Sequence, residues 1–160
     1  MPSKKTLRAA LIMGAVAALA VTPLAPAAAA SGGGCDNWTH FTEYVSEARS
    51  TNGKGCISYS DGRVRPDAYI NFQFRKPERV SACKAQVLVY KKEGEYSILQ
   101  AGSSRTFNCR TRARDNETGV YYPAYQIRTS SGEYWTVLKV TVTYGPGDLF
   151  IHSGSPHVKP

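Results

Sequence analysis

The chain has 160 residues, with 20 Lys and Arg against 12 Asp and Glu, a formal net charge of +8. Residues 31–160 have the usual size of one domain, which is long enough to bury a hydrophobic core, so disulfides need not be its only support. They keep 17 basic and 12 acidic residues, a net charge of +5. This excess indicates either an anionic partner, such as an acidic protein face or a cell-wall polymer, or simple solubility.

Residues 1–30 have the features of a secretory signal. Lys4, Lys5 and Arg8 form a basic start, residues 9–24 are apolar and Ala-rich, and residues 28–30 form a small-residue cleavage site. Prolines interrupt the apolar run and no stop-transfer charges follow it. We therefore expect a secreted, extracellular protein that begins near Ser31 and has no membrane span in its mature form.

Four cysteines lie outside the signal: Cys35, Cys56, Cys83 and Cys109. An even number of cysteines in an exported chain indicates two disulfides, for which three connectivities are possible. The pairs Cys35–Cys56 and Cys83–Cys109 are favoured because each closes a local unit, and each would contribute roughly 3 kcal/mol in the chain-entropy model. No C-x-x-C pair is present, so we expect no metal site.

The first part of the mature chain contains a leader, a segment that fits two kinds of element, and a turn. Residues 31–34, SGGG, are expected to be a flexible leader before a domain at 35–144. Residues 38–48 have apolar spacing that fits either a short helix, with Thr39 as its cap, or a strand, and the helix is slightly favoured. Residues 52–55, NGKG, predict a turn.

Short strands are expected from there on. Asp61-Gly62 predicts a type I′ hairpin, and Pro66-Asp67 a second turn. Pro123 makes the strand at 120–128 an edge or bulged strand, because proline donates no ladder hydrogen bond. The predicted strands are 56–60, 63–65, 68–75, 83–91, 96–99, 105–110, 120–128 and 134–144.

The segment 134–144, YWTVLKVTVTY, is expected to be the central strand. Its alternation places Leu138, Val140 and Val142 on the core face, and Lys139, Thr141 and Thr143 on the wet face. Residues 145–160 are rich in Gly and Pro and are expected to form a C-terminal tail. The whole pattern predicts an all-β antiparallel sandwich or barrel of seven or eight short strands, with a possible short N-terminal helix and two disulfides.

Catalytic patterns are missing from the sequence. The chain has three histidines, no G-x-S-x-G element, and acidic residues mostly at turns. Phosphate-binding loops and dinucleotide fingerprints are also absent. We therefore expect a non-enzymatic protein without a cofactor.

Tyrosine is the unusual component, with ten residues. Tyr and Arg anchor many protein interfaces, although Tyr is also an ordinary strand former. Arg near Tyr would also suit nucleic acid, but export removes most such partners, so no nucleic acid is expected. The candidate partner-binding residues are Tyr121, Tyr122, Tyr125, Arg110, Arg112 and Arg114.

These observations favour an exported module that binds another secreted protein through an acidic contact face of that protein. In its plan the chain resembles the small adaptor subunit of actinomycete umbrella toxin particles, on its export signal, N-terminal arm and small β domain with paired cysteines. The resemblance implies an adaptor that joins a large toxin chain to a lectin-like subunit. Two alternatives remain: a secreted protease or glycosidase inhibitor that presents residues 115–119, and a carbohydrate or cell-wall binding module that uses Trp38, Trp135 and the tyrosines.

Overall fold

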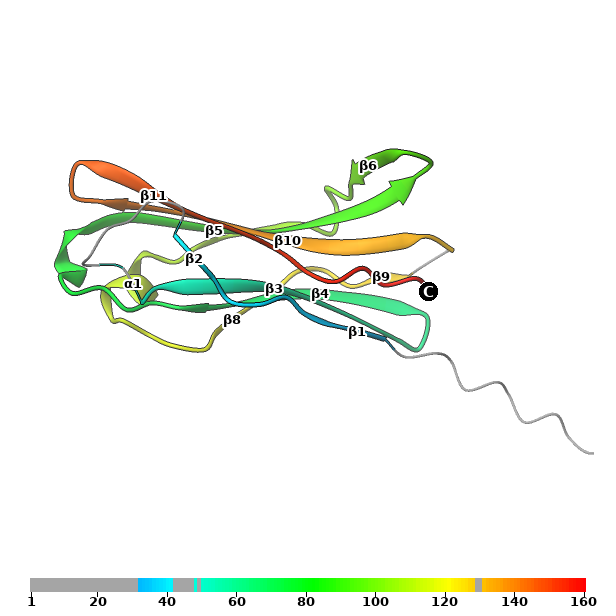
Figure 1. The fold of residues 1–160 in the computed structure, drawn as a ribbon, viewed down its shortest axis with the longest axis horizontal. Helices are drawn as coiled ribbons and strands as arrows, with labels where there is room; N and C mark the ends of the chain where they lie inside the picture. Colours follow the sequence, from blue (N-terminus) through cyan, green and yellow to red (C-terminus); the bar gives the residue numbers. More distant parts are fainter. Residues whose placement is uncertain (1–31, 42–47, 49, 129–130) are drawn as a thin grey trace, which may run out of the picture.

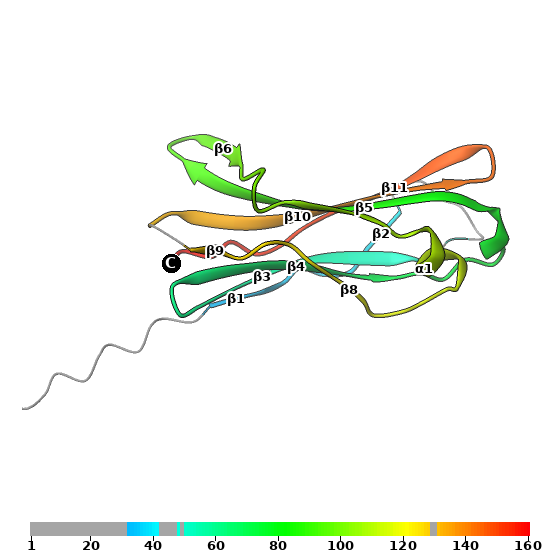
Figure 2. The ribbon, with the colours of Figure 1, turned by 180° about the vertical axis from the view of Figure 1, so that it is seen from behind.

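The computed structural model describes residues 32–41, 48, 50–128 and 131–160. Two antiparallel sheets face each other across a common core, as both views show (Figures 1 and 2). The predicted all-β fold is confirmed as a sandwich and not a closed barrel, since the described strands form two separate sheets. Within the described residues, every helix is too short or too polar to cross a lipid bilayer.

The first layer, sheet A, has the strand order β1-β3-β4-β8. Strands β1 and β2 pair one after the other with the same edge of β3, and β8 and β9 pair one after the other with the far edge of β4. Each outer edge of sheet A is therefore formed by two short strands with a gap between them. The strands are β1 (Gly32–Cys35), β2 (Thr39–His40), β3 (Asn52–Ser60), β4 (Arg63–Asn71), β8 (Val120–Pro123) and β9 (Ile127–Arg128).

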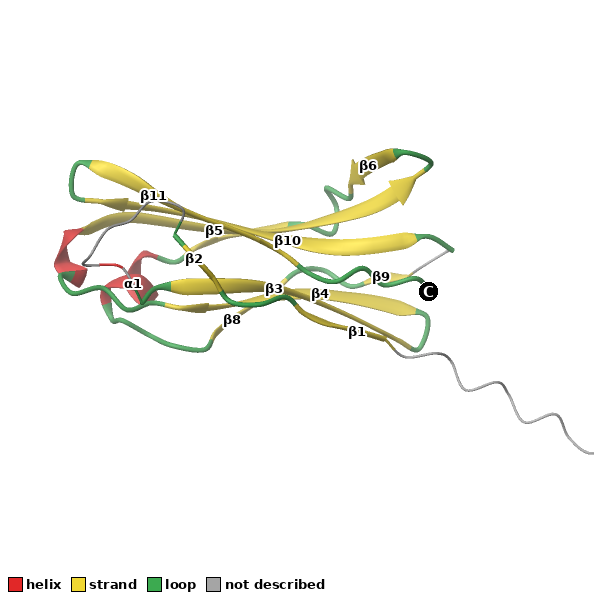
Figure 3. Ribbon diagram, in the orientation of Figure 1, coloured by secondary structure: helices red, strands yellow, loops and turns green. Residues whose placement is uncertain are grey.

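The second layer, sheet B, has the order β11-β10-β5-β6, with β7 also paired to β5. Its strands are β5 (Val80–Glu93), β6 (Tyr96–Leu99), β7 (Arg105–Asn108), β10 (Glu133–Tyr144) and β11 (Gly147–Gly154). The short helices η2 (Pro77–Arg79) and α1 (Arg110–Arg114) lie at one end of the sandwich (Figure 3). The hairpin of β5 and β6 lies at the opposite end (Figure 1).

Strand β10 is central to sheet B, as predicted. It pairs with β5 on one side and β11 on the other. Leu138, Val140 and Val142 are buried against sheet A, whereas Lys139 is exposed. The period-two alternation therefore assigns the two faces correctly.

The core lies between the inner faces of the two sheets. Its largest fully buried side chain is Phe72, just beyond the end of β4. Phe72 stacks near Phe74, and Phe74 stacks on Tyr144 of β10 with ring centroids 5.3 Å apart. Burial of aromatic rings of this size is a major contribution to the stability of a domain.

Both predicted disulfides are confirmed. Cys35 and Cys56 lie directly opposite each other in the β1–β3 pair. Cys83 of β5 is bonded to Cys109, and the Cys109 amide donates to the Cys83 carbonyl at 3.0 Å. The first bond fastens the N-terminal strand to sheet A, and the second fastens the start of α1 to sheet B.

Of the predicted turns at 52–55, 61–62 and 66–67, one is confirmed and two are wrong. Asp61 and Gly62 both have positive φ, 54° and 68°, and Ser60 pairs with Arg63, which confirms the type I′ hairpin. The predicted turn at 52–55 is wrong, because these residues lie inside β3. A Cβ on Gly53 would lie 2.7 Å from Leu138 Cδ2, so the glycine there allows close packing of the two sheets. The predicted turn at Pro66-Asp67 is also wrong, because it lies within β4.

The predicted leader is instead an edge strand in the part that is described. Residues 32–34 pair with Tyr59, Ser58 and Ile57 of β3. Gly33 has φ of 119°, and a Cβ there would lie 2.1 Å from the Ile57 carbonyl oxygen. Glycine at this position is therefore a requirement for pairing rather than a sign of a free arm. Ser31 lies outside the described residues.

The predicted C-terminal tail also belongs to the domain. Residues 147–154 form β11, whose Leu149, Ile151 and Ser153 are buried with a period of two. Beyond it, the Val158 and Tyr134 backbones exchange two hydrogen bonds of 2.9 Å, and the Val158 side chain is buried. The Gly and Pro residues that indicate a tail flank this strand without preventing it.

Two further segments differ from expectation. The predicted strand at 105–110 ends at Asn108, and α1 begins at Arg110. Within the predicted helix at 38–48, Thr39 and His40 form β2, and residues 42–47 lie outside the described residues. The edge strand at 120–128 is confirmed as two short pieces, β8 and β9.

We predict that Val140→Asp unfolds the domain, whereas Thr141→Asp leaves it folded. Val140 is buried in the core, where an unpaired charge costs several kcal/mol against a total stability of about 5–15 kcal/mol. Thr141 lies on the outer face of sheet B. Thermal unfolding followed by circular dichroism checks this, and equal loss of structure in both variants would contradict the assigned faces.

Candidate binding surfaces

The three predicted partner-binding tyrosines point in different directions. Tyr121 lies on the outer face of sheet A and is 51% exposed, whereas Tyr122 points into the core and is 6% exposed. Tyr122 packs on Phe107 with ring centroids 5.0 Å apart. Tyr125 lies beyond the end of β8, with the Arg105 guanidinium 4.8 Å from its ring centroid. Only Tyr121 and Tyr125 are therefore accessible to a partner.

The burial of Tyr122 also affects its hydroxyl. Burial raises the pKa of Tyr122 to about 12, an effect that the nearby Arg112 guanidinium opposes. Among the described residues, the Tyr122 hydroxyl has no hydrogen-bond partner. Tyr122 is thus a core residue, and its place in a partner surface is a misassignment.

The three predicted arginines lie on α1, away from the exposed tyrosine of sheet A. Arg112 forms an ion pair with Glu117, which raises the pKa of the arginine. Arg110 borders a hollow on sheet B, and Arg114 is exposed. The predicted Tyr–Arg set therefore does not form one continuous surface.

The outer face of sheet A carries a row of aromatic rings and one lysine. Tyr69 and Tyr121 lie opposite each other on β4 and β8, with ring centroids 5.3 Å apart. The Lys54 ammonium lies 4.5 Å from the ring centroid of Trp38 and 5.8 Å from that of Tyr69. A cation of the same chain thus already covers part of this aromatic surface.

One carboxylate borders this row. Burial raises the pKa of Asp67 above its ordinary value, and a hydrogen bond with the Tyr121 side chain partly offsets this shift. The pKa of Tyr121 is raised as well, first by burial and then by the nearby Asp67 charge. The Asp67–Tyr121 contact holds the ring of Tyr121 in place on the sheet.

A second aromatic row crosses the outer face of sheet B. Leu99, Tyr90 and Trp135 are successive cross-strand neighbours on β6, β5 and β10. Tyr90 stacks on Trp135 with centroids 5.7 Å apart, and Trp135 stacks on the His157 ring at 4.6 Å. This row therefore ends against the C-terminal segment.

The C-terminal segment is fastened beside that row by charge. His157 Nδ1 lies 2.6 Å from Glu133 Oε1, and Lys159 Nζ lies 3.8 Å from Glu133 Oε2. The hydrogen bond with His157 holds the pKa of Glu133 below its ordinary value. The His157 ring is thus kept in place on Trp135.

Three exposed apolar side chains of sheet B lie together on β6. Tyr96, Ile98 and Leu99 are 75%, 42% and 44% exposed, and every residue of this edge strand is exposed. The β5–β6 hairpin rises away from sheet A at its end of the molecule (Figure 1). Leu99 lies on the outer face with its partner Tyr90, whereas Ile98 and Tyr96 lie opposite Lys91 and Glu93 and point to the other face of the hairpin. We define the hairpin patch as the exposed and stacked side chains on both faces of this edge: Tyr90, Tyr96, Ile98, Leu99 and Trp135.

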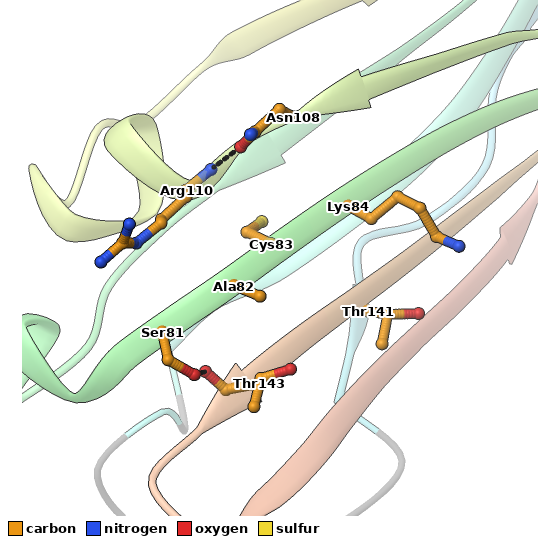
Figure 4. A pocket seen from close by; sticks show the side chains of 8 residues that line it. All are labelled: Ser81, Ala82, Cys83, Lys84, Asn108, Arg110, Thr141 and Thr143. Carbon is orange, nitrogen blue, oxygen red and sulfur yellow. Dashed lines mark hydrogen bonds between the residues drawn. The ribbon is translucent and has the colours of Figure 1, made fainter.

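Two shallow hollows lie toward the other end of the same outer face. The first has a volume of about 380 Å³ and lies over β5, β7 and the end of β10 (Figure 4). The second has a volume of about 320 Å³ and lies over β5, β10 and β11. Thr141 lines both hollows, so they are neighbours on one face.

The structure also bears on the carbohydrate-binding alternative and on metal binding. Trp38 and Trp135 lie on opposite outer faces of the sandwich, so they do not form the single stacking platform that a carbohydrate-binding reading requires. Within the described part of the chain, no three His, Cys, Asp or Glu side chains are grouped so as to hold a metal ion.

The hairpin patch was missed because its residues come from three separated strands. The sequence shows Tyr96, Ile98 and Leu99 as an ordinary apolar strand, and periodicity does not say that this strand lies at an exposed edge. The inward direction of Tyr122, in contrast, could have been predicted from the sequence. A period of two already places adjacent tyrosines 121 and 122 on opposite faces of a strand.

No protein-family model matches the chain, and neither the curated proteins nor the solved structures contain a match to it. The chain is therefore described by its fold alone, as a two-layer antiparallel β-sandwich with two disulfides.

We predict that Tyr122→Ala lowers the free energy of unfolding by about 3–5 kcal/mol, as for other large buried rings. Tyr121→Ala removes a half-exposed ring and should cost less than about 1 kcal/mol, the range of a cross-strand pair on an open face. Urea denaturation of both variants measures the difference. Similar stabilities for the two variants would contradict the assigned directions of the side chains.

Proposed function

We propose that the protein is an exported, non-enzymatic module that docks on another secreted protein through the hairpin patch. The observation that carries this proposal is the exposure of Tyr96, Ile98 and Leu99 together on one edge strand. Leu99 lies on the outer face of this strand and Tyr96 and Ile98 on its other face, so apolar side chains surround the free edge. Large exposed apolar areas on a folded domain mark interaction sites.

The row on the outer face extends this surface inward. Leu99 continues into the half-buried rings of Tyr90 and Trp135, which are stacked and so lose little side-chain freedom on binding. Rigid aromatic side chains surrounded by smaller apolar contacts are typical of the energetic centre of an interface. The hairpin patch therefore combines a fixed aromatic row next to Leu99 on the outer face with Tyr96 and Ile98 on the other face of β6.

The free edge of β6 offers a second type of contact. It is the last strand in the order β11-β10-β5-β6, so one of its sides is not paired with a described strand. A strand of a partner can add to such an edge through main-chain hydrogen bonds, while side chains beside it give specificity. Addition of a strand and apolar contact can thus occur at the same place.

Charge at the hairpin is mixed. Lys91 Nζ lies 3.6 Å from Glu93 Oε1, and the neighbouring Glu95 and Lys92 are exposed. A partner for this end therefore needs no strongly acidic face. An acidic contact face, as the net charge of +5 led us to expect, would instead suit the lysines farther along sheet B.

Export is part of the same proposal. The basic start, apolar run and small-residue cleavage site of residues 1–30 support it, and so do two disulfides, which persist in oxidising compartments. An adaptor role of the umbrella-particle kind remains compatible with this arrangement. In that case the hairpin patch would be a docking element, because the described part of the glycine arm pairs with its own β3.

The inhibitor alternative has less support. The loop at 115–119 is fastened to its own domain: Asn116 exchanges side-chain hydrogen bonds of 2.8 and 2.9 Å with the Phe74 backbone. The Glu117 carbonyl accepts from the Phe72 amide at 2.8 Å. An inhibitory loop has to project into the cleft of an enzyme, whereas this one is held against the segment that follows β4.

We predict that Tyr96→Ala or Leu99→Ala raises the dissociation rate from the native partner at least roughly tenfold, or about 1.4 kcal/mol. The partner is first isolated by size exclusion of the native culture fluid, and the rates are then measured on a surface that carries it. Truncation of a central apolar contact acts mainly on dissociation.

Tyr121→Ala and Tyr125→Ala are matched controls for Tyr96→Ala, since each also removes an exposed tyrosine ring, but from a different surface. Both should bind like the wild type. If the controls dissociate faster while the β6 variants do not, the docking site lies at the sequence-predicted tyrosines and the hairpin patch is not the interface.

A further inference from the structure

The two hollows of sheet B form a basic surface with apolar and polar lining at the end opposite the hairpin patch. Cross-strand pairing places most of their outward residues in two rows: Asn108, Lys84, Thr141 and Phe150 in one, and Gln86, Lys139 and His152 in the next, which Thr106 of β7 continues. The rows run across β7, β5, β10 and β11. The surface is therefore built on the four paired strands rather than on loops.

Three exposed cationic side chains, those of Lys84, Lys139 and Arg110, border this surface. Lys84 and Lys139 are diagonal neighbours on β5 and β10, which places their Cβ atoms about 7 Å apart. Figure 4 shows the Lys84 and Arg110 side chains pointing in opposite directions from the first hollow. Among the described residues, no ion pair involves any of the three side chains. Their charge remains available to an anionic ligand.

The second disulfide positions one side of the hollow. The bond from Cys83 to Cys109 fastens the residue before α1 against β5. The Asn108 side-chain oxygen then accepts from the Arg110 amide at 3.0 Å, which ties these two residues together. Asn108 is thus held beside its partner Lys84, and the backbone of Arg110 is held at the border of the hollow.

The remaining lining residues supply hydroxyl and amide groups. Thr141, Gln86 and Asn108 provide donors and acceptors between the cations. At the far side, the Thr143 hydroxyl donates to the Asp148 carboxylate at 2.7 Å. That carboxylate repels anions there and directs negative groups of a ligand toward Lys84, Lys139 and Arg110.

An exposed aromatic ring completes the second hollow. Phe150 of β11 is 43% exposed and lies directly opposite Thr141, beside Lys139 and His152. An apolar ring beside hydroxyl and amide groups suits the face of a sugar, which has C–H groups on one side and hydroxyls around its rim. An acidic peptide would use the cations but would have no need of the ring and hydroxyls together.

We propose that this surface binds an acidic glycan, a sugar chain that carries carboxylate, sulfate or phosphate groups. The negative groups contact Lys84, Lys139 and Arg110, the sugar hydroxyls contact Thr141 and Asn108, and one sugar ring packs on Phe150. The site is separate from the hairpin patch and does not depend on the proposed docking function, so one molecule can hold a protein partner and a glycan together.

The test is calorimetric titration of the mature protein alone, at low salt, with oligosaccharides of equal length that carry uronate, sulfate or no charge. A glycerol phosphate oligomer is a fourth probe. The three charged probes identify which oxyanion is preferred. We expect binding of at least one charged sugar chain and none of the neutral chain.

Variants locate the site. Lys84→Ala combined with Lys139→Ala should weaken binding roughly tenfold or more. Phe150→Ala should weaken it roughly fivefold, with unchanged circular dichroism. Arg63→Ala removes one exposed charge from sheet A and is the matched control, which should bind like the wild type.

Polyglutamate of similar charge is the last probe. If polyglutamate binds as tightly as the acidic sugar chains, and Phe150→Ala changes neither affinity, the surface accepts acidic protein segments and the glycan proposal is wrong. Failure of every charged sugar chain to bind would overturn it as well. Neither result bears on the hairpin patch, because no protein partner is present in the assay.

Discussion

The pairing of β5 with β10 is the constraint on which the rest of the structure depends. The two strands stay in register from Glu133 opposite Lys92 to Thr143 opposite Ala82, with a shift only at Tyr144. Inward residues of both strands form half of the core, and outward residues form the outer face of sheet B. A shift of this pairing by one residue would exchange the two sets. The burial of the valines therefore determines which residues form the outer surface as well as which residues form the core.

That register brings distant residues together on the surface. It places Tyr90 on Trp135 at one end and Lys84 beside Thr141 at the other. Neither neighbourhood depends on a flexible loop, which favours binding with little loss of conformational entropy. Sheet A differs, because there Lys54 lies over the rings of Trp38 and Tyr69. The two outer faces therefore have different chemical character, and sheet B is the more available of the two.

Much of the fold followed from local patterns. The alternation of 134–144, the Asp61-Gly62 hairpin and the locality of each cysteine pair all depend on neighbours in the sequence, and the structure bears them out. The roles of Gly53 and Gly33 could not be predicted from their neighbours in the sequence. Their lack of a side chain is required by Leu138 and by the Ile57 carbonyl, which are neighbours only in the folded chain. The strand at 147–154 was not predicted for a related reason, because it forms by pairing with β10.

The candidate binding surfaces were harder to predict, because each combines strands whose order in the sheet no periodicity reveals. Hydrogen–deuterium exchange of the isolated protein, compared with the protein in its native complex, tests the central claim directly. We predict slowed exchange in Tyr96–Leu99 and the paired part of β5, with no change in β4 and β8. Protection confined to β4 and β8, or to the glycine strand β1, would contradict the assignment of function to sheet B.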